Sequence, residues 1–451
     1  MTSPLRPAWE AESGLRGRLY ALGRRIVPLA WRRAVRRRVA PESLLGIRKP
    51  VVAVATLPGP AAGPPGARAD VVVLPVISWS YRRQRPQQLA EALARRGRRV
   101  FYGSVAGSGE PPEAAAVAPG VTLLPIDGVR REDLADRPLD ARARERAEAS
   151  IAAARERFEI GRAVVLAQSP YWAPLSAALR ARFGWPFVYD CLDAHEGFGT
   201  NRPGLLSEAE ADGSREADLV VATSESLRRR LSFPGREARL LPNACDYALF
   251  AGLPLPPPLR APGASRPRGR LVVGYVGAVD AWFDFELLEA AARLRPEWSF
   301  EIVGGLENAA STRPMPANVV FLGERPHGEM PAVRARFDVE IIPFRLSPLT
   351  HATDPVKLYE AAASGRPVVA TPLASLEGFA QRGLVRLAPT TEAFVEAVEA
   401  AAAEGPDAAA RRRAFAAANT WDDRAAALDG WIEPLVVAAA ASGRATQGSA
   451  P

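Results

Sequence analysis

Two long stretches of this 451-residue chain alternate short apolar runs with alanine-rich segments, and that alternation limits the fold more than any other feature. Short runs of Val, Leu, Ile and Ala are typical of strands buried on both faces, and the segments between them have room for covering helices. The expected strands are 71–77, 99–103, 121–124, 163–167, 187–189, 219–222 and 239–241, then 271–276, 299–303, 319–322, 339–344, 367–370 and 384–387. We therefore predict an α/β chain with two doubly wound parallel sheets.

Two proline-rich breaks divide the chain, at 58–69 and 253–267. Such segments favour neither helix nor strand, so they suit a tether and an interdomain linker. The expected organisation is a basic amphipathic arm and flexible tether at 1–68, a first α/β domain at 69–250 and a linker at 251–269. A second α/β domain at 270–420, a C-terminal helix at 421–441 and a disordered tail at 442–451 complete it.

The net charge of +8 is concentrated near the N-terminus. Residues 16–38 contain nine arginines and no acid, so the rest of the chain has a net charge of −1. A body that is nearly neutral does not have the basic surface of a nucleic-acid-binding protein, and we expect no nucleic-acid partner.

Residues 16–39 combine these arginines with apolar residues at helical spacing, interrupted by Pro28. This pattern fits a helix pair on an anionic membrane surface, and it fits a solvated basic helix equally well. No run of about 18 apolar residues exists to span a bilayer, and the arginines argue against a secretory signal. With two cysteines only, Cys191 and Cys245, we expect a reduced, cytoplasmic location, with peripheral membrane association through the arm.

A motif with chemical content lies at 354–370. Asp354 and Pro355 are typical of a helix start, Lys357 and Glu360 follow in the first turns, and Gly365 is typical of a helix end. Lys357 is one of only two lysines in the chain. The strand, loop, helix and strand around it form the unit at which open α/β sheets bind ligands, so the helix start predicts a diphosphate site.

Over residues 70–435, the two domains and this motif resemble the GT-B glycosyltransferases, and specifically the retaining family 4 or group 1 type. Segments 79–89, 189–193, 217–224 and 241–243 are similar to a teichuronic-acid or exopolysaccharide biosynthesis subgroup, segment 274–277 opens the second domain as in the family, and 354–370 is the strongest match. The resemblance implies two Rossmann-like domains facing a cleft, with the acceptor in the first and a nucleotide-sugar in the second. It also implies a hexosyltransferase that needs no metal or other cofactor, which agrees with a sequence that contains no Asp-x-Asp triplet.

The chain departs from the family at two places. The first of the family's two glutamates is replaced by Ala352, and the loop after Gly277 has no Arg and Lys pair. By resemblance, the donor-binding residues are Gly277, Arg345, Asp354, Lys357 and Glu360, with Glu360 on the ribose and the two cations on the diphosphate. Other readings stay open: Asp354 as a helix cap, Lys357 and Glu360 as an ion pair, and Gly277 as a turn glycine.

Candidate residues in the first domain lie after its strands. Trp79, Arg82 and Arg85 are candidates for acceptor binding, or else Trp79 fills an interdomain core and the arginines are solvated. Asp193 and His195 are the candidate catalytic residues, because they follow a strand at the edge that faces the cleft, although His195 also suits a surface loop.

The leading function is therefore transfer of a sugar from a nucleotide-sugar donor to a cell-surface glycan or lipid-linked acceptor. Two alternatives share the architecture. A nucleotide-sugar 2-epimerase would turn over the donor without an acceptor, and a non-catalytic GT-B-like binding protein would bind a nucleotide without turnover.

Overall fold

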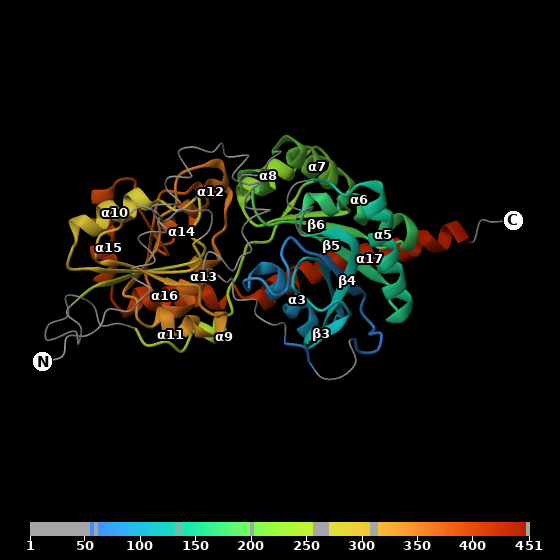
Figure 1. Ribbon diagram of the computed structural model, residues 1–451, viewed down its shortest axis with the longest axis horizontal. Helices are drawn as coiled ribbons and strands as arrows, with labels where there is room; N and C mark the ends of the chain where they lie inside the picture. The colour runs from blue at the N-terminus through green and yellow to red at the C-terminus, as the bar shows by residue number, and fades with distance from the viewer. Residues whose placement is uncertain are drawn as a thin grey trace, which may run out of the picture.

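The computed structural model describes residues 55–57, 62–130, 134, 137–198, 203–255, 270–306 and 314–447. The basic arm at 16–39 and most of the 251–269 linker lie outside these residues. Figure 1 shows two α/β domains side by side, with the N-terminal domain in blue to green and the C-terminal domain in yellow to orange.

The first domain is built on an eight-stranded sheet with the order β3-β4-β2-β1-β5-β6-β7-β8. Every pairing is parallel except that of β3 with β4. The strands are β1 Asp70–Leu74, β2 Val100–Ala106, β3 Ala115–Ala118, β4 Val121–Arg130, β5 Ala163–Ala167, β6 Phe187–Cys191, β7 Leu219–Ala222 and β8 Arg239–Leu240. The strand order reverses between β1 and β5, so the switch point of this domain lies there.

The second domain has an all-parallel six-stranded sheet with the order β11-β10-β9-β12-β13-β14. The strands are β9 Val272–Val276, β10 Ser299–Val303, β11 Val319–Gly323, β12 Val339–Ile342, β13 Val368–Ala370 and β14 Arg386–Leu387. Its switch point lies between β9 and β12. The predicted α/β class, with two domains built on largely parallel sheets, is confirmed.

Helices cover both sheets (Figure 1). In the first domain these are α3 Arg85–Arg95, α5 Ala141–Arg157, α6 Ala173–Phe183, α7 Pro203–Glu216 and α8 Glu225–Leu231, with short 3-10 helices η2 Pro170–Trp172 and η3 His195–Phe198. The short helix α9 Tyr247–Phe250 follows β8 but packs on the second domain (Figure 1), where Phe250 shares an apolar cluster with Phe337 and Tyr359. In the second they are α10 Phe285–Leu294, α11 Met330–Arg334, α12 Pro348–Ala352, α13 Val356–Ser364, α14 Glu377–Gln381, α15 Thr391–Ala402 and α16 Pro406–Ala417, with η4 His327–Glu329 and η5 Ala374–Leu376.

The last helix, α17 Trp421–Gln447, returns to the first domain. Its buried residues Trp421, Leu428 and Ile432 join the apolar cluster that contains Val71 and Leu89 of β1 and α3. Arg98 donates to Asp429 of α17 at 2.5 Å, with the arginine side chain fully buried. The helix therefore links the two domains, and it continues six residues beyond the predicted end at 441 into the segment expected to be disordered.

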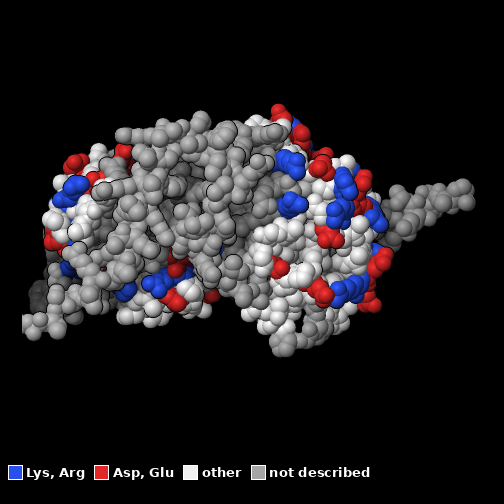
Figure 2. Space-filling view, viewed as in Figure 1, with Lys and Arg blue, Asp and Glu red and all other residues white. Residues whose placement is uncertain are grey.

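The described surface of the first domain carries mixed charge. Figure 2 shows Lys and Arg interspersed with Asp and Glu over the visible face of that domain. Many of these groups pair, as Arg182 does with Glu148 and Arg228 with Glu225. Within the described residues, no helix is both long and apolar enough to cross a bilayer.

Candidate functional site

Two glycines form the floor of the site at the switch point of the second domain. Gly277 follows β9 with φ +148, and Gly304 follows β10 with φ +151. The register pairs Val276 with Val303, so the two glycines lie side by side. A Cβ on Gly304 would overlap the carbonyl oxygen of Gly277. The close approach of the two backbones, together with positive φ, requires glycine at both positions.

Lys357 lies in the first turn of α13 and extends over these glycines. Its Nζ is 4.5 Å from the Phe344 ring centre and 5.0 Å from the Tyr275 ring centre. A Cβ on Gly277 would lie 3.0 Å from that Nζ. Burial lowers the pKa of Lys357 to about 8, against the opposing effect of Glu360. Because Lys357 forms no ion pair with any described residue, its charge is available to an anion over the glycine loop.

Glu360 lies one turn further along α13 and is held by Arg334. The Arg334 Nη2 donates to Glu360 Oε2 at 2.5 Å. The same fully buried arginine also pairs with Glu340. The Lys357–Glu360 ion pair considered from the sequence does not form, because Arg334 takes the carboxylate instead. Among the described residues, no hydrogen bond reaches Glu360 Oε1, which leaves that oxygen for a ligand hydroxyl.

Asp354 is buried and joins the motif to the end of the first domain. The residue that caps α13 is Pro355, and no side chain caps the helix. Instead, Asp354 Oδ2 accepts from the Asn243 amide at 2.6 Å, and the Tyr359 hydroxyl donates to the same carboxylate at 3.1 Å. Burial raises the pKa of Asp354 to about 6. The predicted cap and donor contact are thus replaced by a buried link between the motif and the end of the first domain.

Arg345 lies at the rim of the site. Its backbone amide donates to Trp282 O at 2.8 Å, which fixes the loop after β12. The side chain is 52% exposed and its nearest described acid is Glu286, at 3.9 Å. A long, exposed pair of this kind holds a side chain only weakly.

Asp193 faces the second domain from the end of β6. Burial raises the pKa of Asp193 to about 7, while the charges of Arg85 and Lys357 oppose the rise. Thr353, which lies between α12 and α13, is also among the groups that lower the pKa of Asp193. A carboxyl group of the first domain therefore lies near the Lys357 charge and exchanges a proton near neutral pH.

His195 belongs to a different cluster. Ligand atoms of Cys191, His195 and Glu210 lie within 4.8 Å of one another, and all three residues are buried. Burial and the charge of Arg230 lower the pKa of His195 to about 4, so the ring is neutral. Glu210 already accepts from Arg230 at 2.7 Å and from Tyr189 at 2.9 Å. A metal ion here would have to displace Arg230, so these three residues fit an ion poorly.

The three predicted acceptor residues separate in space. Trp79 packs edge-on against Tyr102 with ring centres 5.1 Å apart and joins the core of the first domain. Arg85 is buried and donates to both oxygens of Asp190, at 2.7 and 3.1 Å. Arg82 pairs with Glu324 of the second domain. The structure therefore does not bring the three residues into one cluster, and Arg85 is buried in an ion pair with Asp190.

Ala352, at the family's first glutamate position, is buried against the first domain. It shares an apolar cluster with Ala194 and Leu349. A Cβ on Gly197 of η3 would lie 2.5 Å from Leu349 Cβ, which shows how closely α12 approaches the first domain. Ala352 lies in a contact between the domains, where an unpaired carboxylate would lose hydration free energy.

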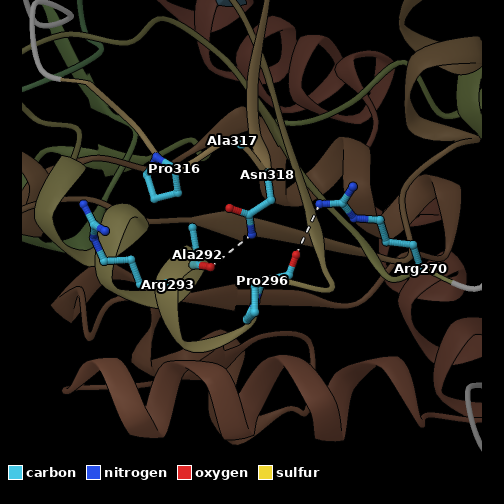
Figure 3. A pocket seen from close by; sticks show the side chains of 7 residues that line it. All are labelled: Arg270, Ala292, Arg293, Pro296, Pro316, Ala317 and Asn318. Atoms are coloured by element: carbon cyan, nitrogen blue, oxygen red, sulfur yellow. Dashed lines mark hydrogen bonds between the residues drawn. The ribbon is translucent and has the colours of Figure 1, made fainter.

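A pocket of about 510 Å³ lies elsewhere in the second domain (Figure 3). Its lining residues Arg270, Pro296 and Asn318 precede β9, β10 and β11, so it opens at the amino ends of the strands. Asn318 donates to the Ala292 carbonyl near the end of α10, at 3.0 Å. The pocket lies at the edge opposite the glycine loop and does not belong to the site.

Several residues of the site were not predicted from the sequence. Arg334 and Thr353 act through tertiary contacts that no local pattern reveals. Gly304 and Gly305 were detectable, because a glycine pair directly after the predicted strand 299–303 is the same signal that identified Gly277.

Comparison with known proteins agrees with this architecture. Residues 83–244 match the family described as Glycosyl transferase 4-like domain, and residues 270–404 match the family described as Glycosyl transferases group 1. The Bacillus subtilis (strain 168) protein TuaH, named for a proposed glycosyltransferase role in teichuronic acid biosynthesis, is 30% identical over 225 residues. That match covers 46% of this chain and 55% of TuaH, so the chain spans about half the length of this curated relative.

Solved structures share the fold at low sequence identity. Sucrose-phosphate synthase of Thermosynechococcus elongatus has a TM-score of 0.57 at 18% identity, over 85% of this chain and all of that one. Anabaena HepE in complex with UDP has a TM-score of 0.56 at 14% identity, over 80% of this chain and 99% of that one. With a glycosyltransferase family match in each of its two α/β domains, the chain belongs to the GT-B glycosyltransferases of the group 1, family 4 type.

Proposed function

We propose that this protein transfers a sugar from a nucleoside-diphosphate sugar to a cell-surface glycan or lipid-linked acceptor, with retention and without a metal. The observation that carries the proposal is Lys357, which lies unpaired among the described residues over Gly277 at the start of α13. A cation, backbone amides and a glycine floor at one switch point are the groups that a diphosphate requires.

The chemistry follows from where charge develops. Departure of the nucleoside diphosphate leaves negative charge on the phosphate that was bonded to the sugar, and preorganised cations and amides stabilise it. Lys357 supplies the cation and the first turn of α13 supplies the amides. Glu360, oriented by Arg334, presents Oε1 to a ribose hydroxyl. These groups stabilise the leaving group without a bound ion.

Asp193 is the first-domain residue best placed to handle the acceptor proton. Its pKa of about 7 lets it hold or release a proton at neutral pH. Retention, expected from the family, assigns the main share of proton acceptance to the leaving phosphate, with Asp193 orienting the acceptor hydroxyl. Proton NMR of the anomeric centre in the first product decides this point, because an inverted product would refute retention.

The names of related proteins support the proposed class of acceptor. TuaH is named for teichuronic acid biosynthesis, and WaaG, a second fold neighbour with a TM-score of 0.51, is described as acting in lipopolysaccharide biosynthesis. Both names concern cell-envelope glycans. We extend this class to the present chain and place the enzyme in the cytoplasm, at the membrane face where lipid-linked acceptors are exposed.

The basic segment 16–39 would hold the enzyme at that face. Each arginine near an anionic surface contributes about 1 kcal/mol of attraction. Flotation with vesicles containing anionic lipid, comparing the full chain with a chain lacking residues 1–50, tests the attachment. Equal flotation of both proteins would refute it.

The donor site is tested by thermal shift with a panel of nucleosides, nucleoside diphosphates and nucleotide sugars. Wild type is compared with Glu360→Ala and Glu360→Gln, each measured relative to its own ligand-free melting temperature because Arg334 loses a partner in the first variant. We expect stabilisation of wild type by one base series, a loss with alanine and partial retention with glutamine. No stabilisation of wild type by any diphosphate would refute the site.

Turnover assays separate this function from its alternatives. Donor consumption that requires an acceptor supports a transferase, whereas conversion of the donor sugar without acceptor identifies an epimerase. If the protein binds a nucleotide but shows no turnover with any acceptor tested, the non-catalytic binding protein is supported.

A further inference from the structure

Arg82 extends from the first domain across to the second. It lies in the loop between β1 and α3, and its Nε and Nη2 donate to Glu324 Oε1 and Oε2 at 2.6 and 3.2 Å. Glu324 directly follows β11 in the second domain. This is a two-point Arg–carboxylate contact between the domains, and such forks fix orientation as well as charge.

The Arg82 guanidinium lies against the glycine loop of the donor domain. A Cβ on Gly305 would collide with Arg82 Nη2. Gly305 in turn accepts a hydrogen bond from the Val279 amide at 3.0 Å, which ties it to the loop after β9. The Arg82 charge also lowers the pKa of Tyr275, although burial raises that pKa more strongly. Tyr275 is one of the rings beneath Lys357, so both cations lie around the same loop.

The Arg82 loop is held in place before any ligand binds. The Gln87 side chain, in the first turn of α3, donates to the carbonyls of Ser78 and Arg82 at 3.2 and 3.1 Å. Arg82 also donates to the Tyr81 hydroxyl at 3.0 Å. The Arg82 and Glu324 side chains are 19% and 28% exposed, so solvent reaches the pair. A fixed loop with a reachable cation suits ligand binding with little ordering cost.

The loop after Gly277 supplies no cation beside Lys357, since it continues as Ala278, Val279 and Asp280. A diphosphate there would carry more negative charge than Lys357 alone neutralises. We propose that Arg82 is the second diphosphate-binding cation of this enzyme, supplied by the first domain, with Glu324 as its partner while the site is empty. This inference rests on the proposed function of the donor site.

The assignment has a mechanical consequence. Because one diphosphate would contact Lys357 of one domain and Arg82 of the other, donor binding would favour the closed arrangement of the domains. Glu324 would compete with the phosphate for the guanidinium, so removal of its charge should tighten donor binding. A lysine at position 82 would keep the charge but lose the fork.

Isothermal titration with UDP, GDP and ADP, and with the matching nucleosides, tests the proposal. For whichever diphosphate wild type binds, we expect Arg82→Ala to weaken binding about 10- to 100-fold, as for loss of a charge-assisted contact, and to leave nucleoside binding within about twofold. Arg82→Lys should lie between the two, and Glu324→Gln should bind a few-fold more tightly than wild type.

Arg182→Ala is the matched control. Arg182 also pairs with a glutamate, Glu148, at 2.9 Å and lies over an aromatic ring, Phe183, at 5.1 Å, but on α6. Its loss should leave all affinities unchanged. If Arg82→Ala binds the diphosphate as wild type does, or loses nucleoside and diphosphate equally, the assignment to Arg82 is wrong while the donor site stands. If wild type binds no diphosphate, the proposed function fails first and this inference with it.

Discussion

Lys357 makes donor binding depend on pH in a calculable way. Burial is the main reason that its pKa is lowered to about 8. Only the protonated amine attracts the diphosphate, so this contribution to affinity is complete well below pH 8 and is lost as pH rises through 8. The direction is fixed by the sign of the shift, because an unperturbed lysine would stay charged to about pH 10.

The size of the effect follows from the same pKa. At pH 9, one unit above it, about one molecule in ten keeps the proton, so the dissociation constant should rise about tenfold relative to pH 7. Lys357→Arg should abolish this dependence, since guanidinium stays charged throughout the range. Lys357→Ala should bind weakly at every pH. Between pH 7 and 9 the phosphates of the ligand are already ionised and do not contribute to the slope.

Isothermal titration of the bound diphosphate at pH 7, 8 and 9 measures this slope. Repeating each titration in two buffers with different ionisation enthalpies counts the protons taken up on binding. Asp193→Asn serves as a control, because Asp193 has a pKa of about 7 and its charge acts on Lys357. A Lys357→Arg protein that keeps the wild-type slope would show that another group titrates, and the role given to Lys357 would be refuted.

Two further predictions concern the buried network around the site. Arg334→Leu should lower the free energy of unfolding by about 3 to 5 kcal/mol in urea titrations, because it leaves the Glu340 and Glu360 carboxylates without their buried partner; an unchanged midpoint would contradict this. Asp354 has a folded pKa of about 6, above its unfolded value near 3.8, so folding favours its protonated form. Its contribution to stability is full below about pH 4 and is lost as pH rises to 6, on the order of 3 kcal/mol, and Asp354→Asn should remove that slope from urea titrations between pH 4 and 7.

The strands were predictable where burial is complete. Strands β5 and β7 have their predicted bounds, because each is a continuous run of buried apolar residues. Strand β10 also has its predicted bounds, with Phe300, Ile302 and Val303 buried and Ser299 and Glu301 half-buried. Strand β3, Ala115–Ala118, was missed. Alanine has little preference for strands, and this segment is extended because it pairs antiparallel with β4 at the edge of the sheet. Tertiary pairing, which a local pattern does not contain, decided its structure.

The site was predictable only where chemistry and local structure coincide. The helix that carries Lys357 and Glu360 was predicted because a helix start has its own sequence signal, and α13 begins at Val356. Three arginines of one short segment show that residue type alone does not predict what a side chain contacts. Arg82 contacts Glu324 in the other domain, Arg83 pairs with Glu91 within its own domain, and Arg85 is buried on Asp190. Their residue type is identical and their spacing is small, so only the packed structure separates the arginine that reaches the other domain from the two that pair within their own.

The contacts across the cleft explain how Ala352 fits this arrangement. Leu349 packs on Gly197, and Trp282 meets Phe198 with ring centres 5.8 Å apart, so this part of the domain interface is apolar. Ala352 belongs to it, and a carboxylate there would lose hydration against the first domain. The apolar contact therefore takes the place of a charged group, and beside it Asp193 of the first domain lies near the Lys357 charge. Apolar neighbours lower the local dielectric, which strengthens the attraction between the Lys357 cation and an anionic donor, as the proposed transfer requires.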